Sequence, residues 1–155
     1  MRFRAADIDT YLKAADYVDT ALIPLMKTTW ATEAKTVTQA VEFTAQLADE
    51  MERQFHGRIM QFPAFTYAQS EPMASRIDRL LGWAADLKAA SFSHICLLTA
   101  DGEWKTAENE LDEMALFFVP ALPLEFVEAK HRKEVMDGQL KQLIPFLSQL
   151  WQQKV

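Results

Sequence analysis

The chain has 155 residues, of which half are hydrophobic and a quarter charged, and its formal net charge is −6. This length and composition are typical of one globular domain rather than of a disordered chain. The negative charge argues against a surface that tracks nucleic-acid phosphates, because such a surface needs clustered Lys and Arg. The one basic cluster, Lys130 to Lys133, lies among acidic residues, so a solvated helix face explains it.

Neither the N-terminus nor the apolar runs of the chain indicate a membrane protein. The N-terminal residues lack the apolar core of a secretory signal. The longest apolar run, Met114 to Leu124, has eleven residues and two prolines, too few to cross a bilayer. The single cysteine, Cys96, cannot form an internal disulfide. We therefore expect a cytoplasmic, soluble protein with no membrane span, folded as one domain over residues 1–155.

The first half of the chain predicts two helices that alternate with two strands. Apolar residues recur at helical spacing over residues 7–15 and 36–55. Two short apolar runs, each followed by a proline, are typical of strands, because proline cannot continue a ladder. These strands are Thr20–Ile23, which ends at Pro24, and Arg58–Phe62, which ends at Pro63.

The second half predicts a helix over residues 72–90 and then a strand, His94–Thr99, that reads as apolar on both faces. An acidic connection follows, from Asp101 to Glu113, and a fourth strand, Ala115–Val119, ends at Pro120. Residues 125–153 are helical in composition. We expect a kink or break there between Gly138 and Pro145, because proline removes a helical hydrogen bond.

Strands that alternate with helices predict a three-layer α/β fold with a mainly parallel sheet and helices on both faces. The simplest order for four strands is 2-1-3-4, flavodoxin-like or Rossmann-like in outline. The short third connection leaves an antiparallel fourth strand open as an alternative. The expected core residues are Leu22, Ile23, Ile95, Leu97, Leu98, Leu116 and Phe118, with Cys96 buried among them.

Polar and aromatic residues gather just after the predicted strands. Ligands of open parallel sheets bind beyond the carboxyl ends of the strands. The candidate ligand contacts there are Thr66, Tyr67, Thr99, Asp101 and Trp104. The alternative is that the prolines rigidify turns and the aromatic side chains only cover the end of the sheet.

No motif identifies a catalyst or a cofactor. The glycine patterns of nucleotide-binding loops and the G-x-S-x-G elbow are absent from the sequence. His56, His94 and His131 are far apart and lack a second metal ligand at helical or loop spacing. The acidic residues between Asp101 and Glu113 miss the calcium-loop pattern, so a solvated loop explains them better. We expect no catalytic residues, no metal and no cofactor.

Several strings of residues resemble the YpiF family, a group of small uncharacterised proteins from Bacillus-type bacteria. They run in the same order along nearly the whole chain: Asp7-Ile8-Asp9, Tyr17-Val18-Asp19-Thr20 with Pro24, Glu52-Arg53-Gln54-Phe55 with Gly57-Arg58, Phe65-Thr66-Tyr67, and Val119 to Glu125. The resemblance supplies no catalytic residues. The YpiF family is associated with genes for the quinol–cytochrome c reductase. The resemblance therefore implies an accessory role in a respiratory complex.

Two functional hypotheses follow. The first, which we favour, is a non-catalytic interaction or assembly module that binds another protein or forms a homodimer. It rests on the missing catalytic constellation and on the uncharged fourth strand, whose N–H and C=O groups can pair with another chain if it lies at a sheet edge. The second is a small-molecule-binding protein or enzyme that uses a pocket at the strand ends, for a ligand that the sequence does not identify.

Overall fold

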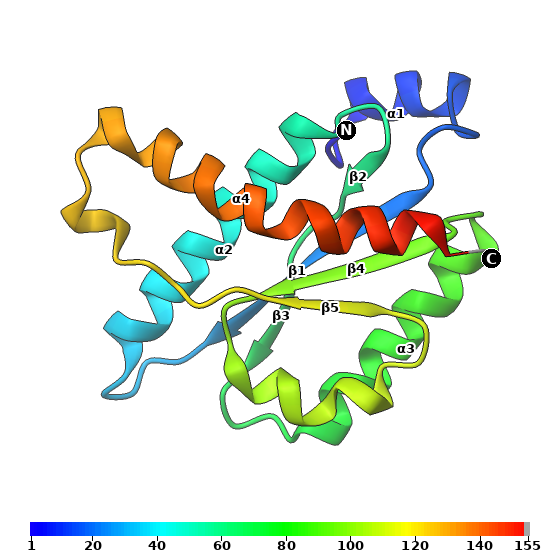
Figure 1. Cartoon of the computed structure of the whole chain (residues 1–155). Helices are drawn as coiled ribbons and strands as arrows, with labels where there is room; N and C mark the ends of the chain where they lie inside the picture. The colour runs from blue at the N-terminus through cyan, green and yellow to red at the C-terminus, as the bar shows by residue number, and fades with distance from the viewer. Residues whose placement is uncertain (154–155) are drawn as a thin grey trace.

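A computed structural model describes residues 1–153 of the chain. These residues form five strands, four α-helices and two 3₁₀ helices (Figure 1). In chain order the elements are α1 (Ala5–Lys13), β1 (Thr20–Thr28), α2 (Ala34–Gln54), β2 (Ile59–Gln61), β3 (Phe65–Ala68), α3 (Met73–Ala89), β4 (His94–Thr99), η1 (Gly102–Glu110), β5 (Ala115–Phe118), η2 (Leu124–Phe126) and α4 (Ala129–Gln152).

The five strands form one parallel sheet in the order β2-β1-β4-β5, with β3 also paired to β1. The α/β fold predicted from the sequence is confirmed. The expected order of four strands differs only by the added strand β3, which the sequence analysis assigned to a loop. The connection through η1 brings the chain back to the start of the sheet, and β5 pairs with β4 in parallel. The antiparallel alternative for this last strand is therefore wrong.

The central strand β1 continues past Pro24, so the expected end of this strand at the proline is wrong. Even-numbered residues of β1 bond to β2 and β3, since Leu22 accepts a hydrogen bond from Phe62 and Thr28 accepts one from Gln69. Pro24 therefore presents its ring nitrogen toward the interruption between β2 and β3. Pro24 lies between Leu22, the last residue of β1 paired with β2, and Leu25, the first paired with β3, and proline is tolerated inside a strand where the ladder is interrupted.

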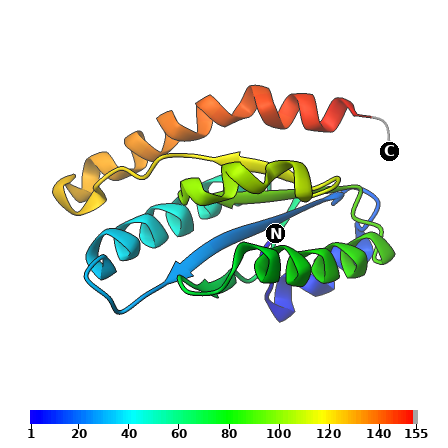
Figure 2. The same cartoon turned by 90° about the horizontal axis from the view of Figure 1, so that it is seen from below.

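Helices cover both faces of the sheet (Figures 1 and 2). One core cluster joins α2 and α4 to Leu22, Cys96 and Leu98 of the central strands. The other cluster lies on the opposite face, where α3 and η1 pack against Ile23 and Leu97. Successive strand residues thus point to opposite faces, and both faces are buried, as a doubly covered parallel sheet requires.

Two expected core residues, Leu116 and Phe118, are only half-buried, whereas their neighbour Phe117 is buried. The reason is the position of β5 at the edge of the sheet. Phe117 points toward α4 and joins the core beneath it. The other five expected core residues are buried, and so is Cys96.

Of the kink or break expected between Gly138 and Pro145, the break does not occur, because α4 is one helix that contains Pro145. Leu140 and Leu143 before the proline and Leu147 and Leu150 after it are all buried in the same cluster. Packing on both sides of Pro145 holds the two halves together despite the missing hydrogen bond.

Candidate functional site

The two central strands separate at their carboxyl ends and leave a cavity between them. The ladder between β1 and β4 ends at the pair of Pro24 with Leu98, whereas β1 continues to Thr28. A cavity of about 190 Å³ lies at this point, bounded by the ends of β1 and β4 and by α2. Ligands of open parallel sheets bind at such a crevice between diverging strands.

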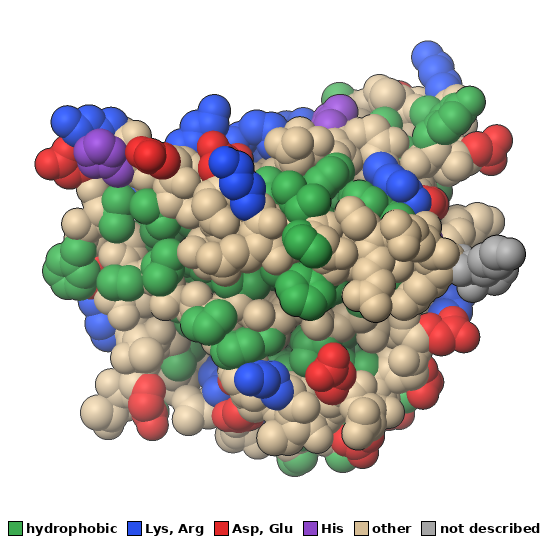
Figure 3. Space-filling model, viewed as in Figure 1, with side chains coloured by type: hydrophobic (Ala, Val, Ile, Leu, Met, Phe, Trp, Pro, Cys, Tyr) green, Lys and Arg blue, Asp and Glu red, His purple; other side chains and the backbone are tan. Residues whose placement is uncertain are grey.

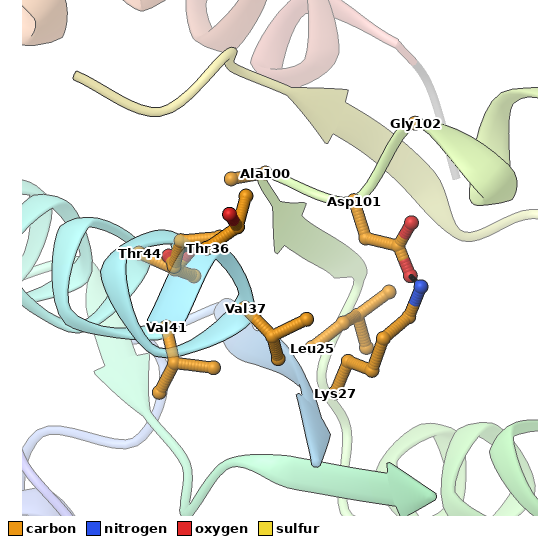
Figure 4. A pocket seen from close by; sticks show the side chains of 10 residues that line it. Leu25, Lys27, Thr36, Val37, Val41, Thr44, Ala100, Asp101 and Gly102 are labelled. Atoms are coloured by element: carbon orange, nitrogen blue, oxygen red, sulfur yellow. Dashed lines mark hydrogen bonds and ion pairs between the residues drawn. The ribbon is translucent and has the colours of Figure 1, made fainter. Parts of the chain in front are cut away.

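Apolar side chains line most of this cavity, and charged groups lie at one end of it (Figure 4). Leu25, Val37 and Val41 contribute aliphatic side chains from β1 and α2. At the other end, the Lys27 ammonium lies 3.3 Å from Oδ2 of Asp101. The cavity therefore suits a small ligand with an apolar body and a polar group that reaches this ion pair.

Asp101 is held by a hydrogen-bond network that extends into the core. The Tyr67 hydroxyl donates to Oδ2 of Asp101 over 2.7 Å and accepts from Nε1 of Trp104 over 2.8 Å. The Asp101 N–H donates to Oγ1 of Thr99. Burial is the main cause that raises the pKa of Tyr67 well above its ordinary value, so the hydroxyl keeps its proton and remains a donor to Asp101. The network fixes the loop after β4 against β3.

A second set of charges extends this network toward α3. Glu103 accepts from Lys27 over 2.9 Å and from Nη1 of Arg76 over 3.0 Å. The Lys27 hydrogen bond, with the Arg76 one, lowers the pKa of Glu103. Arg76 is buried, donates to the carbonyls of Glu71 and Gln69, and lies 4.4 Å over the Tyr67 ring. These contacts stabilise the guanidinium charge where water does not reach it.

The structure brings four of the five predicted contact residues together. Tyr67, Thr99, Asp101 and Trp104 belong to one network, but only Asp101 lines the cavity. Tyr67 and Trp104 are buried beneath it. Thr66 alternates with Tyr67 along β3 and points outward to solvent, away from the network.

Sequence analysis missed Lys27, Arg76 and the cavity wall from α2. Lys27 follows Pro24, where the strand was expected to have ended. Arg76 occupies one of the polar positions of a helix, and nothing in its local sequence distinguishes it from a solvated arginine. Only the continuation of β1 and the approach of α3 bring these charges to Asp101 and Glu103.

The outer edge of β5 is the second candidate site. Val119 donates to the Thr99 carbonyl, so odd-numbered residues here bond to β4 and the even-numbered Leu116 and Phe118 point their N–H and C=O groups away from the sheet. Within residues 1–153, no hydrogen bond reaches the backbone of these two residues from that side. The edge of β5 is thus open for pairing.

The opposite edge of the sheet is covered along β2 and partly along β3. The N-terminal segment pairs with β2 through a bridge between Arg2 and Gln61, and Gln61 donates to the Met1 carbonyl. Beside β3, Arg79 donates to the outward carbonyl of Thr66 over 3.2 Å. The fold therefore covers the outer side of β2 and the two outward carbonyls of β3, those of Thr66 and Ala68, whereas neither the N–H nor the C=O of Leu116 and Phe118 has a partner within residues 1–153.

Within residues 1–153, no three His, Cys, Asp or Glu side chains come together in an arrangement that could hold a metal ion. None of the helices described is long and apolar enough to cross a membrane.

Comparisons with known proteins link the whole chain to one group of sequences. A family model described as a protein of unknown function, DUF2487, matches residues 9–151. An uncharacterized protein from Bacillus subtilis (strain 168), YpiF, is 33% identical over 151 residues, which cover 97% of this chain and 98% of that protein. A solved structure, described as a sigma-54 interaction domain protein from Enterococcus faecalis, aligns with a TM-score of 0.43 at 9% identity, over 83% of this chain and 95% of that one.

The hydroxyl of Tyr67 gives a test of the buried network. Tyr67→Phe removes the acceptor of the Trp104 N–H and a donor to Asp101, so we expect the free energy of unfolding to fall by about 1–3 kcal/mol. Tyr17→Phe is the matched control, because Tyr17 is 76% exposed; its effect should stay within about 0.5 kcal/mol. Urea denaturation measures both. Equal effects of the two substitutions would show that the network does not stabilise the fold.

Proposed function

This chain belongs to the DUF2487 family of proteins of unknown function, and we propose that it is a non-catalytic interaction module that binds an extended strand of a partner along β5. The resemblance to YpiF proteins predicted from the sequence is confirmed by the relative from Bacillus subtilis. The observation that carries the proposal is the open edge, where Leu116 and Phe118 present free backbone donors and acceptors. Strand addition to such an edge is a common mode of peptide recognition.

The side chains around β5 support the same proposal. Leu116 and Phe118 are half-buried, and Phe146 of α4 is 58% exposed with its ring centroid 6.4 Å from that of Phe117. Figure 3 looks onto this side of the molecule and shows hydrophobic side chains in a band across its middle, over β5 and α4. A docked strand would bury these side chains, at roughly 25 cal/mol for each Å² of apolar surface removed from water.

The strand-end network supports a non-catalytic role. Its two carboxylates are both engaged by neighbours: Asp101 by Tyr67 and Lys27, and Glu103 by Lys27 and Arg76. Such contacts suit a structural role. The accessory role in a respiratory complex that the family resemblance implies would be one case of strand docking.

Site-specific photocrosslinking in a bacterial host tests the proposal. A photoreactive phenylalanine analogue at Phe118 should give a discrete protein adduct, because this residue lies on the docking edge. The same analogue at Phe126 is the control, since this side chain is 80% exposed but lies in η2, outside β5. An adduct at Phe118 that disappears in the Leu116→Pro background, which lacks the outward N–H, would support docking. No adduct at Phe118, or equal adducts at both positions, would contradict it.

The strand-end cavity favours a second candidate function, the binding of a small molecule. Its position between diverging strands and its single charged end carry this candidate. In this case Asp101 would contact the ligand directly, and Tyr67, Thr99 and Trp104 would hold Asp101 in place. Thr66 points away from the cavity and has no part in it.

A thermal-shift screen of nucleotides, sugar phosphates and carboxylates tests this second function. A ligand at a hundred times its Kd should raise the Tm by about 5–10 °C for a domain of this size. Val41→Trp fills the cavity from the α2 side and should abolish the shift, while circular dichroism checks that the fold persists. Absence of any shift in the native chain, or an unchanged shift in the variant, would contradict binding in this cavity.

A further inference from the structure

We infer that the occupant of the β5 edge is a second copy of this chain, paired antiparallel about a twofold axis at Phe117. The inference rests on the proposed docking function and names its partner. An isologous pair of this kind uses the same surface of both copies, which is the commonest symmetry among protein dimers.

The hydrogen-bonding groups of the edge are complementary to themselves in one register. With the axis at Phe117, Leu116 of one copy lies opposite Phe118 of the second copy. By symmetry, Phe118 of the first copy lies opposite Leu116 of the second. Residues whose N–H and C=O groups point across an antiparallel pair exchange two hydrogen bonds. Both pairs would therefore form completely, with every outward group of β5 used.

Other registers lose hydrogen bonds because of the residues that flank β5. An axis at Leu116 would bring Met114 into the ladder, but its N–H already donates to the Leu111 carbonyl. An axis at Phe118 would bring in Pro120, which has no N–H. The flanking residues thus limit the ladder to Leu116 and Phe118, and the register is specified.

The side chains agree with this register on both faces of the sheet. On the α4 face, the Phe117 side chains of the two copies meet at the axis, with Phe146 beside each of them. On the other face, Leu116 of each copy lies next to Phe118 of the other. Apolar and aromatic cross-strand pairs of this kind contribute to the stability of a sheet.

The distribution of charge also fits a second copy. Each chain carries a formal charge of −6, so two copies repel one another unless the surface that joins them is uncharged. Residues 114–124 and 142–153 contain no charged side chain, and they include β5 and the half of α4 that carries Phe146. One charged group lies beside the edge, since the Lys105 ammonium is 4.9 Å from the Phe118 ring centroid.

Cysteine crosslinking tests the register. Leu116→Cys and Phe118→Cys are prepared separately, then mixed and mildly oxidised. Opposite residues in a hydrogen-bonded pair have their Cα atoms about 5.5 Å apart, within the range of a disulfide. We expect the mixture to form covalent dimers in clearly higher yield than either variant alone. The native chain is the control, because its only thiol, Cys96, is buried. Efficient linkage of either variant alone would overturn the register.

Light scattering at micromolar concentration tests the partner. The native chain should have twice the chain mass, and Leu116→Lys should be a monomer with an unchanged circular dichroism spectrum. A monomeric native chain that still gives the Phe118 photoadduct with a different protein would overturn the second copy but leave the docking function standing. A monomeric chain with no photoadduct would overturn both.

Discussion

The pairing of β1 on both of its sides is the constraint on which the rest of this structure depends. Its even-numbered residues bond to β2 and β3, and Asp19, just before the strand, accepts from His94 of β4. Residues 20–25 are buried on both faces, so each backbone group here needs a partner within the sheet. This requirement fixes which strands lie beside β1 and, through them, where the sheet begins and ends.

Both candidate sites follow from that arrangement. Because β1 remains paired with β3 after β4 has left it, a crevice opens at the carboxyl ends of the central strands, and α2 lines it. At the far side of β4, β5 has one paired side and one free side. The N-terminal segment covers the outer side of β2, and Arg79 binds the outward carbonyl of Thr66 in β3. This difference between the two edges is the reason to assign partner binding to β5.

Sequence patterns predict the parts of this fold that depend on local residues. The apolar run Ile95–Leu98 predicts the place of β4, His94–Thr99, because a strand covered on both faces has apolar residues at successive positions. The extension of β1 past Pro24 could not be predicted, since it depends on where a strand distant in sequence is interrupted. In β5 the pattern does not show which of three consecutive apolar residues faces α4, so Leu116 and Phe118 were expected in the core in place of Phe117. At the strand ends, the sequence places Tyr67 and Asp101 near each other, but their contact with Lys27 needs the longer β1.

The central claim is that the outward groups of β5 are free in the single chain and occupied when the edge is paired. Amide hydrogen exchange, resolved by residue, measures this directly. In dilute solution the amides of Leu116 and Phe118 should exchange rapidly, while those of Phe117 and Val119, which point toward β4, stay protected. At a concentration where the chain associates, Leu116 and Phe118 should become protected as well. Slow exchange of all four amides in a dilute monomer would contradict the account, because the edge of β5 would then be covered by the chain itself.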